Sequence, residues 1–229
     1  MNKYLKSKVA GNVIILIASI AIIYLLISLY FVNHCFFNTE INRVDISLKS
    51  HNEVEGIIKS HAENYKLQLI ERNAEIEEII GQDIGIQYNR SNNISKIYKM
   101  QHPFKWISSL LEKQRYYEAD LFIYNSDSLE NKVNELNCLN QNIIEPHNVS
   151  FKYSNGSYEA IAEVYGNKIY EDRLKEAIEL SISAGETKLD LNENNCYENP
   201  KYTLSSDKSL EAKNLLDKYV ATKITYVFG

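Results

Sequence analysis

The sequence predicts an α+β protein in which a single N-terminal transmembrane helix precedes several strand-helix-strand units. Three observations predict this: a long uncharged apolar stretch near the N-terminus, short segments in which apolar and polar residues alternate, and segments with apolar residues at helical spacing. Units of this kind build mostly antiparallel sheet with helices on one face. Behind the apolar stretch, the chain has room for one large or two small domains.

The apolar stretch occupies residues 13–32 and contains no charged residue. As a helix rising about 1.5 Å per residue it measures roughly 30 Å, which is the thickness of a bilayer's hydrocarbon core. It is longer than the apolar core of a cleaved signal peptide, and residues 31–36 offer no small-x-small cleavage site. We therefore expect an uncleaved signal anchor over residues 9–32.

The charges on either side of this stretch predict its orientation. Residues 1–8 carry three lysines and no acid, and the next charge behind the stretch is Glu40. Basic flanks stay cytoplasmic, so a single-pass protein of the cell membrane with an outer C-terminal region is expected. Without the three lysines, the formal net charge of −5 becomes −8. Because no basic cluster is evident in the outer region, nucleic acid is not an expected partner.

The first outer unit is predicted over residues 41–150, after a spacer at 33–40. Alternation at residues 44–48 predicts a strand. Ser50 and Glu53 form a capping box at the start of a helix. The apolar face of that helix comprises Val54, Ile57, Ile58 and Ala62.

Further alternation predicts strands at residues 65–69, 76–80 and 84–88. A weaker helical pattern follows over residues 89–114, with Pro103 as a break, and its single tryptophan, Trp106, is expected in the core.

The order of strand and helix then recurs. A strand is expected over residues 121–124, followed by a helix that a capping box of Asp127 and Glu130 would begin. The apolar stripe of this helix consists of Leu129, Val133 and Leu136.

A second domain is predicted over residues 151–229. Asn155 and Gly156 form a hairpin turn, because both residue types tolerate positive φ. A helix over residues 170–183 ends before Gly185, and a strand over 187–191 follows.

For the end of the chain, the sequence predicts a loop, a helix and a strand. The loop comprises residues 192–206 and the strand residues 222–228. The helix between them is expected to bury one apolar face, made of Ala212, Leu215, Leu216, Tyr219 and Val220.

The three cysteines, Cys35, Cys138 and Cys196, are too few for a disulfide scaffold and lack metal-ligand spacing. Cys138 and Cys196 can pair in an oxidising exterior or remain free thiols, and the sequence leaves both alternatives open. No cofactor or metal is expected, since His51 and His61 are ten residues apart and do not form a metal pair.

The segments GETKLDL, CYENPKY and TKITYVFG, all within residues 166–229, resemble a known family. It is the peptidoglycan-binding (YoaR-like) domain found N-terminal to YkuD-type L,D-transpeptidases and beside VanW-like domains. Residues 44–88 are similar to the membrane-proximal start of those proteins. The resemblance implies a cell-wall protein of a Gram-positive bacterium that binds the glycan strand or stem peptide of peptidoglycan. The resemblance leaves three alternatives open: a transpeptidase truncated at its C-terminus, a separately encoded recognition piece, or a fragment that needs a partner chain. A separate catalytic or envelope protein would then be the partner.

The resemblance does not extend to catalysis. The transpeptidases carry their nucleophilic cysteine in a Ser-x-Gly-Cys-Ile/Val-Arg motif, and neither Cys138 nor Cys196 lies beside glycine and arginine. Metalloprotease, serine hydrolase and phosphate-loop motifs do not occur in the sequence either. Glu118 and Asp120, on one face of a predicted strand, could mimic a glycosidase pair, but such pairs arise freely among 30 acidic residues. We expect a protein that is not an enzyme.

The candidate ligand-binding residues are Asn195, Tyr197, Lys201 and Tyr202. Aromatic rings stack on the apolar faces of sugars, amides bind sugar hydroxyls, and Lys201 could meet a stem-peptide carboxylate. The structural alternative is that the two tyrosines cover the edge of a sheet. A second class of function also stays open, a membrane-tethered module that binds another envelope protein through an exposed sheet edge.

Overall fold

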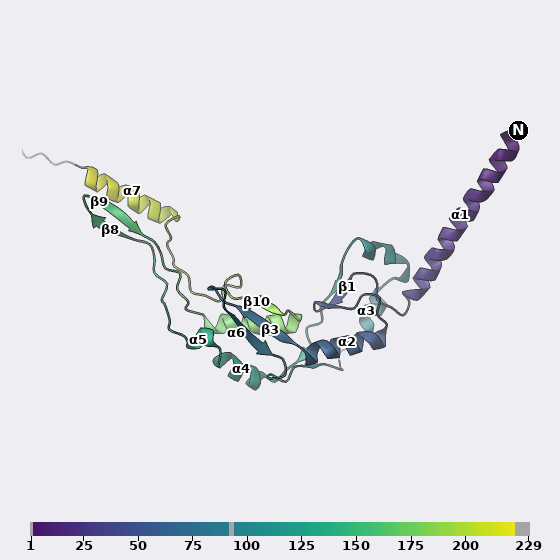
Figure 1. Ribbon diagram of the computed structural model, residues 1–229, viewed down its shortest axis with the longest axis horizontal. Helices are drawn as coiled ribbons and strands as arrows, with labels where there is room; N and C mark the ends of the chain where they lie inside the picture. Colours follow the sequence, from purple (N-terminus) through teal and green to yellow (C-terminus); the bar gives the residue numbers. More distant parts are fainter. Residues whose placement is uncertain (1, 92–93, 223–229) are drawn as a thin grey trace, which may run out of the picture. The chain divides into compact units, whose positions relative to one another are not determined.

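The computed structural model describes residues 2–91 and 94–222 (Figure 1). Helix α1 (Asn2–Tyr30) comes first, and the strands behind it form four small sheets among the described residues, interleaved with helices. The predicted α+β class with an apolar N-terminal helix is confirmed. The predicted placement of all helices on one face of the sheet stays a prediction.

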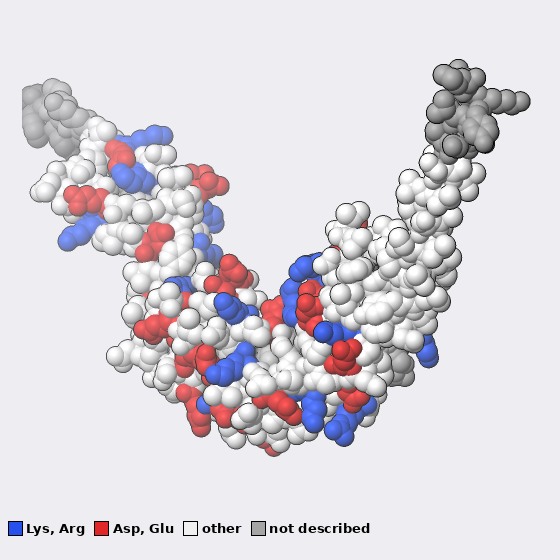
Figure 2. Space-filling view, turned by 45° about the vertical axis from the view of Figure 1, so that its right-hand side comes forward, with Lys and Arg blue, Asp and Glu red and all other residues white. Residues whose placement is uncertain are grey.

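Helix α1 contains one stretch, Gly11–Tyr30, that is long and apolar enough to cross a membrane by length and composition. Its mean hydropathy is 2.8, and most of its side chains are exposed. Figure 2 shows the described part of this helix as a column of white residues, free of lysine, arginine and acidic side chains.

The chain forms two compact units. Unit 1 comprises residues 1–67, 79–129 and 180–187, and unit 2 comprises residues 68–78, 130–179 and 188–229. Each unit is therefore assembled from separate segments of the chain. The predicted domain boundary between residues 150 and 151 stays a prediction.

In unit 1, strand β1 (Thr39–Ile41) lies between β2 (Val44–Asp45) and β6 (Gln114–Tyr116). The β1–β2 pair is antiparallel and the β1–β6 pair is parallel. Strand β1 begins inside the segment predicted as a spacer. The predicted strand over residues 44–48 is too long, because the Asp45 carboxylate accepts hydrogen bonds from Ser47 (N···O 2.9 Å) and turns the chain.

Helix α2 (His51–Glu63) begins with the predicted capping box. The Glu53 carboxylate accepts a hydrogen bond from the backbone N–H of Ser50 at 2.8 Å. Val54, Ile58 and Ala62 are buried on the predicted face. Behind the helix, β5 (Gln87–Tyr88) pairs antiparallel with β7 (Phe122–Ile123).

The segment predicted as weakly helical contains two short helices, α3 (Ser95–Met100) and the 3₁₀ helix η1 (Pro103–Leu110). Pro103 begins η1 rather than only ending the preceding helix, because the first turn of a helix needs no N–H donor there. Trp106 is half-buried.

Unit 1 is closed by the side chain of Asn42, which is only 3% exposed. Its amide nitrogen donates to the carbonyl oxygens of Glu118 at 2.9 Å and Ser183 at 2.6 Å, and its amide oxygen accepts from Glu118 N–H at 2.9 Å. Gly185, with φ of +70°, lies so close that a Cβ there would be 2.1 Å from the Asn42 carbonyl oxygen. One buried amide thus joins three distant segments.

A second three-stranded sheet has the order β10-β3-β4, with bounds Lys188–Asp190, Lys66–Ile70 and Ile76–Ile80. Strands β10 and β3 are parallel, with Leu189 opposite Leu69. These strands match the predicted alternation, and Leu67, Leu69 and Leu189 are buried as expected.

Helix α4 (Ser126–Asn134) starts earlier than predicted. The cap is Asn125, whose side-chain oxygen accepts a hydrogen bond from the Ser128 N–H at 2.8 Å. The predicted capping box of Asp127 and Glu130 is therefore wrong, because Asp127 already lies in the first turn. The predicted stripe of Leu129, Val133 and Leu136 is buried, and the short helix α5 (Asn137–Asn140) follows.

In unit 2, strands β8 (Ser150–Ser154) and β9 (Ser157–Ile161) form the predicted hairpin. Asn155 and Gly156 have φ of 51° and 87°, as the turn requires. Helix α6 (Glu171–Ala184) also follows the prediction, with Leu174, Ile178 and Ile182 buried.

Helix α7 (Asp207–Ala221) is present, but the predicted burial of its apolar face is wrong. Leu215 is 53% exposed and Tyr219 is 68% exposed. Among the described elements, α7 packs against β9. The predicted strand over residues 222–228 lies outside the described residues, apart from Thr222.

Candidate functional site

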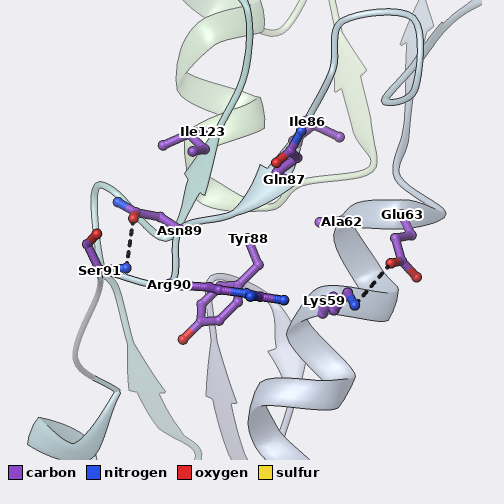
Figure 3. Close-up of a pocket in the computed structure, with 10 residues that line it drawn as sticks. All are labelled: Lys59, Ala62, Glu63, Ile86, Gln87, Tyr88, Asn89, Arg90, Ser91 and Ile123. Atoms are coloured by element: carbon purple, nitrogen blue, oxygen red, sulfur yellow. Dashed lines mark hydrogen bonds and ion pairs between the residues drawn. The ribbon is translucent and has the colours of Figure 1, made fainter.

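A pocket of about 620 Å³ opens in unit 1 beside helix α2 and strand β5 (Figure 3). This volume lies within the range typical of small-ligand sites. The pocket is lined by Lys59, Ala62, Glu63, Ile86, Gln87, Tyr88, Asn89, Arg90, Ser91 and Ile123.

Helix α2 supplies one wall of the pocket. Ala62 is buried, whereas Lys59 and Glu63, one turn apart, stay exposed and form an ion pair with 3.8 Å between Lys59 Nζ and Glu63 Oε1. Residues four apart lie on one helical face, so both side chains border the same opening. This wall therefore has charged side chains at the opening of the pocket and the small side chain of Ala62 at its base.

Strand β5 supplies the opposite wall through the alternation of its side chains. Ile86 is 6% exposed and anchors the strand, and Tyr88 is half-buried at the pocket. Tyr88 lies opposite Phe122 in the antiparallel pair. The backbone N–H of Asn89 donates to the Leu121 carbonyl at 2.9 Å, so the strand end is fixed.

The turn after β5 carries Arg90. The side-chain oxygen of Asn89 accepts a hydrogen bond from the Ser91 N–H at 3.0 Å, which holds the turn in shape. In Figure 3 the Arg90 side chain extends toward helix α2, whereas the amino group of Lys59 points to Glu63. Two cationic groups therefore border one pocket that contains a single carboxylate, Glu63.

The chemistry of the lining suits an uncharged or anionic polar ligand. Burial, and then the nearby Glu55 carboxylate, raise the pKa of Tyr88, so its hydroxyl stays protonated at neutral pH. The tyrosine ring can stack on a sugar face, the Gln87 and Asn89 amides can bind hydroxyl or peptide groups, and Arg90 can pair with a carboxylate. Within the described residues, no group of three or more His, Cys, Asp or Glu side chains could hold a metal ion.

The sequence-predicted loop is arranged differently. Tyr197 is only 2% exposed, and its hydroxyl accepts a hydrogen bond from the Arg72 backbone N–H at 3.1 Å. The Arg72 guanidinium carbon lies 4.3 Å from the centroid of the Tyr197 ring. Tyr197 is thus packed inside unit 2.

The other predicted residues lie nearer the surface. Lys201 and Lys208 each place Nζ 5.6 Å from the centroid of the half-buried Tyr202 ring, so Lys201 and Tyr202 are brought together. Asn195 is exposed in a left-handed conformation with φ of 56°, and its carbonyl accepts from Arg173 at 3.3 Å. Ligand binding by these residues stays a prediction.

The cysteines are free and buried in the structure, so the Cys138–Cys196 disulfide that the sequence allows is not formed there. Burial raises the pKa of the Cys35 and Cys196 thiols to about 11 in each case. Burial and the nearby Glu77 carboxylate raise the pKa of the Cys138 thiol as well. These environments disfavour the thiolate that nucleophilic chemistry needs.

Glu118 and Asp120 are not on one strand face, contrary to the sequence expectation. Both lie between β6 and β7, in a segment without strand pairing, where Asn42 holds the Glu118 backbone. The arrangement that suggested a carboxylate pair is therefore wrong.

Sequence reasoning missed the pocket residues Lys59, Tyr88 and Arg90. The sequence pattern places them only in a predicted helix, a predicted strand and the weakly helical segment over residues 89–114. One signal was available, because Tyr88, Asn89, Arg90 and Ser91 place an aromatic, an amide, a cation and a hydroxyl directly behind an alternating strand. Only the fold shows that helix α2 faces them.

Residues 78–190 match the sequence model of a family described as "Putative peptidoglycan binding domain". No curated protein and no solved structure matches the chain. The resemblance to a peptidoglycan-binding domain is confirmed, although the matched range ends before the segment CYENPKY. It includes seven of the pocket residues, namely Ile86 to Ser91 and Ile123.

Proposed function

We propose that this is a membrane-anchored, non-catalytic protein that binds cell-wall peptidoglycan outside the membrane, because residues 78–190 match the sequence model of a peptidoglycan-binding domain. One observation carries the proposal. The matched range supplies the strand end and turn that border a 620 Å³ pocket with an aromatic ring, amides and cations.

Binding at this pocket uses two kinds of contact. The Tyr88 ring stacks on a sugar or on a stem-peptide side chain, and the amides of Gln87 and Asn89 hydrogen-bond to hydroxyl or peptide groups. Arg90 and Lys59 attract a stem-peptide carboxylate, Arg90 through two parallel hydrogen bonds. The acidic character of the whole chain does not oppose this, because the local charge of the pocket is positive.

The loop that carries Asn195, Tyr197, Lys201 and Tyr202 is the second proposed location for peptidoglycan. Its support is the aromatic ring of Tyr202 with two lysine side chains over it. It lies outside residues 78–190, so the pocket is the preferred site.

The anchor of the proposed protein is the signal anchor over residues 9–32, with residues 1–8 in the cytoplasm. Helix α1 supports this through its length and hydropathy, and the tail lysines support the orientation. The resemblance to the N-terminal region of L,D-transpeptidases supports a wall-binding role beside a separate catalytic protein.

A second candidate function is a membrane-tethered module that binds another envelope protein. The exposed apolar residues of the hairpin and α7 favour it: Tyr153 is 58%, Ile161 50% and Leu215 53% exposed. Surfaces of this composition commonly mark protein contacts.

The test is co-sedimentation of the full chain, in detergent micelles, with purified peptidoglycan sacculi. We expect saturable binding that Tyr88→Ala and Arg90→Ala each weaken about tenfold. Tyr202→Ala with Lys201→Ala tests the second surface, and Tyr153→Ala, an exposed tyrosine elsewhere, is the matched control. A folded protein that stays in solution contradicts the peptidoglycan proposal and favours a protein partner.

A further inference from the structure

The 3₁₀ helix η1 lies directly against the apolar helix α1. The Tyr24 hydroxyl donates to the Phe104 carbonyl at 2.5 Å, and the rings of Tyr24 and Trp106 have centroids 6.0 Å apart. The Phe31 ring, directly behind α1, lies 6.1 Å from the Trp106 ring, so η1 runs beside the C-terminal end of α1.

This contact has a depth along the anchor. Tyr24 precedes Tyr30, the last residue of the membrane-spanning stretch, by six positions. At 1.5 Å per residue, Tyr24 lies about 9 Å inside that end of the stretch. If α1 spans the bilayer, as the proposed function requires, the residues that contact Tyr24 lie at the level of the outer leaflet.

The apolar side chains of η1 and of Leu111 behind it are largely open, although the Phe104 ring also lies 6.3 Å from the Tyr24 ring of α1. Phe104 is 58%, Ile107 51%, Leu110 49% and Leu111 87% exposed. In water, four large neighbouring apolar side chains are an unfavourable surface. The same side chains are favoured at the boundary of headgroups and acyl chains.

The backbone of this segment is also compatible with that environment. The Lys105 N–H donates to the His102 carbonyl at 2.7 Å, and the Leu111 N–H donates to the Ser108 carbonyl at 3.1 Å. The Ser109 hydroxyl donates to the Trp106 carbonyl at 2.6 Å. Internal hydrogen bonds lower the cost of placing a backbone near hydrocarbon.

The charge of the surrounding segment points to anionic headgroups. Residues 96–115 carry five basic residues and one acidic residue, although the whole chain has a formal net charge of −5. Two of the five, Lys113 and Arg115, pair with Glu40 at 3.8 and 2.9 Å. Lys96, Lys99 and Lys105 are exposed. The expectation that the outer region has no basic cluster is wrong for this segment, where apolar residues separate the lysines.

We propose that η1 and Leu111, together with Met100, which is 68% exposed, form a membrane-docking surface that inserts into the outer leaflet beside α1. Lys96, Lys99 and Lys105 then lie at the anionic headgroups. This inference rests on the membrane anchor of the proposed function. Its consequence is that unit 1, with its pocket, is seated on the bilayer instead of hanging from a free tether.

Trp106 is the single tryptophan of the chain, so its fluorescence reports on η1 alone. The full chain is reconstituted into vesicles of phosphatidylcholine and phosphatidylglycerol, with acyl chains brominated either near the carbonyl end or at mid-chain. We expect bromine near the carbonyl end to quench Trp106 at least about twofold and more strongly than bromine at mid-chain. If brominated lipids do not quench Trp106 although the chain resists extraction by alkaline carbonate, the docking surface is overturned and the anchor is not.

A variant separates lipid contact from mere proximity to α1. Phe104→Ser with Leu111→Ser is expected to halve the lipid quenching and to raise quenching by aqueous acrylamide. The matched control is Leu180→Ser, which removes a 61% exposed leucine from α6 and leaves both signals unchanged. Equal quenching in variant and parent contradicts the proposal.

The same vesicles keep the two proposals apart. Sacculi binding is measured on them in parallel, so lipid quenching without sacculi binding rejects only the peptidoglycan function. If alkaline carbonate extracts the chain from the vesicles, the anchor and the docking surface are both rejected.

Discussion

The guanidinium of Arg72 covers the ring of Tyr197, with 4.3 Å between the guanidinium carbon and the ring centroid. The same guanidinium donates to Asn192 at 3.0 Å, to Asn199 at 2.6 Å and to the carbonyl of Tyr165 at 2.9 Å. One cation therefore organises the loop that the sequence suggested as a ligand surface. In this loop, the Tyr197 ring packs against the Arg72 guanidinium.

Replacing Arg72 should destabilise the protein. Arg72→Ala removes charge-assisted hydrogen bonds and a stacked ring contact, so we expect the free energy of unfolding to fall by about 2 to 3 kcal/mol. Urea unfolding of the full chain in micelles, followed by circular dichroism, measures this. Lys201→Ala, a neighbouring exposed cation, should change it by less than about 0.5 kcal/mol. Equal effects of the two variants would argue against Arg72 as the organiser of the loop.

Gly185→Ala should be severely destabilising. Gly185 has φ of +70°, and an added Cβ would lie 2.1 Å from the Asn42 carbonyl oxygen, so backbone must move. We expect a loss of more than about 2 kcal/mol in the free energy of unfolding. Gly156→Ala is the matched control, because its φ of +87° is similar but no atom lies within 4 Å of the added Cβ. That variant should cost only about 1 kcal/mol. Similar losses at the two glycines would refute the close approach.

His61 should make the protein sensitive to acid. Burial lowers the pKa of His61, and its Nε2 is buried without a hydrogen-bond partner among the described residues. The folded state therefore favours the neutral ring. The stability that the neutral His61 ring contributes to the folded state is fully present above the unfolded pKa of about 6.5. It is lost as the pH falls below that value, because the unfolded state then binds the proton more readily.

The measurement is the melting temperature of the protein at about pH 5 and about pH 8, on either side of that value. We expect His61→Phe to reduce the difference between the two melting temperatures. His102→Phe, at an exposed histidine, should leave the difference unchanged. An unaltered pH dependence in His61→Phe would contradict the assignment.

At the pocket, the ring of Tyr88 should matter more than its hydroxyl. Tyr88→Ala removes stacking and should weaken binding to sacculi about tenfold, whereas Tyr88→Phe keeps the ring and should weaken it less than about threefold. Co-sedimentation isotherms on sacculi give both affinities. A larger loss in Tyr88→Phe than in Tyr88→Ala is incompatible with stacking.

The thiols should be present but slow to react. Burial raises the pKa of Cys35 and Cys196 to about 11, so alkylation of the folded protein at neutral pH should be at least about tenfold slower than that of a free thiol. In urea under non-reducing conditions, all three cysteines should titrate. A single titrating thiol would instead demonstrate the Cys138–Cys196 disulfide.

The sequence predicted the elements whose cause is local. The β8–β9 hairpin follows from Asn155 and Gly156, and the start of α2 follows from Ser50 and Glu53, because each signal lies within a few residues. The predicted cap of α4 is wrong because two local signals compete there. Asn125 and Asp127 are both good capping residues, and the local sequence does not choose between them.

The candidate site depended on contacts that no local pattern contains. Tyr88 borders a pocket only because α2 lies opposite β5, and Tyr197 is buried only because Arg72, 125 positions earlier, reaches it. Helix α7 shows the converse, since its periodicity predicted a buried face that the described residues leave exposed.

The hydrogen bond from Asn42 to the Ser183 carbonyl joins residues 141 positions apart. Synthesis proceeds from the N-terminus, so the residues around Asn42 leave the ribosome long before their partner exists. Until residues 180–187 arrive, unit 1 has an incomplete interior and an unpaired amide. The early segments of unit 1 therefore cannot complete their fold until the late ones have been synthesised, and they need protection from aggregation and proteolysis in the meantime.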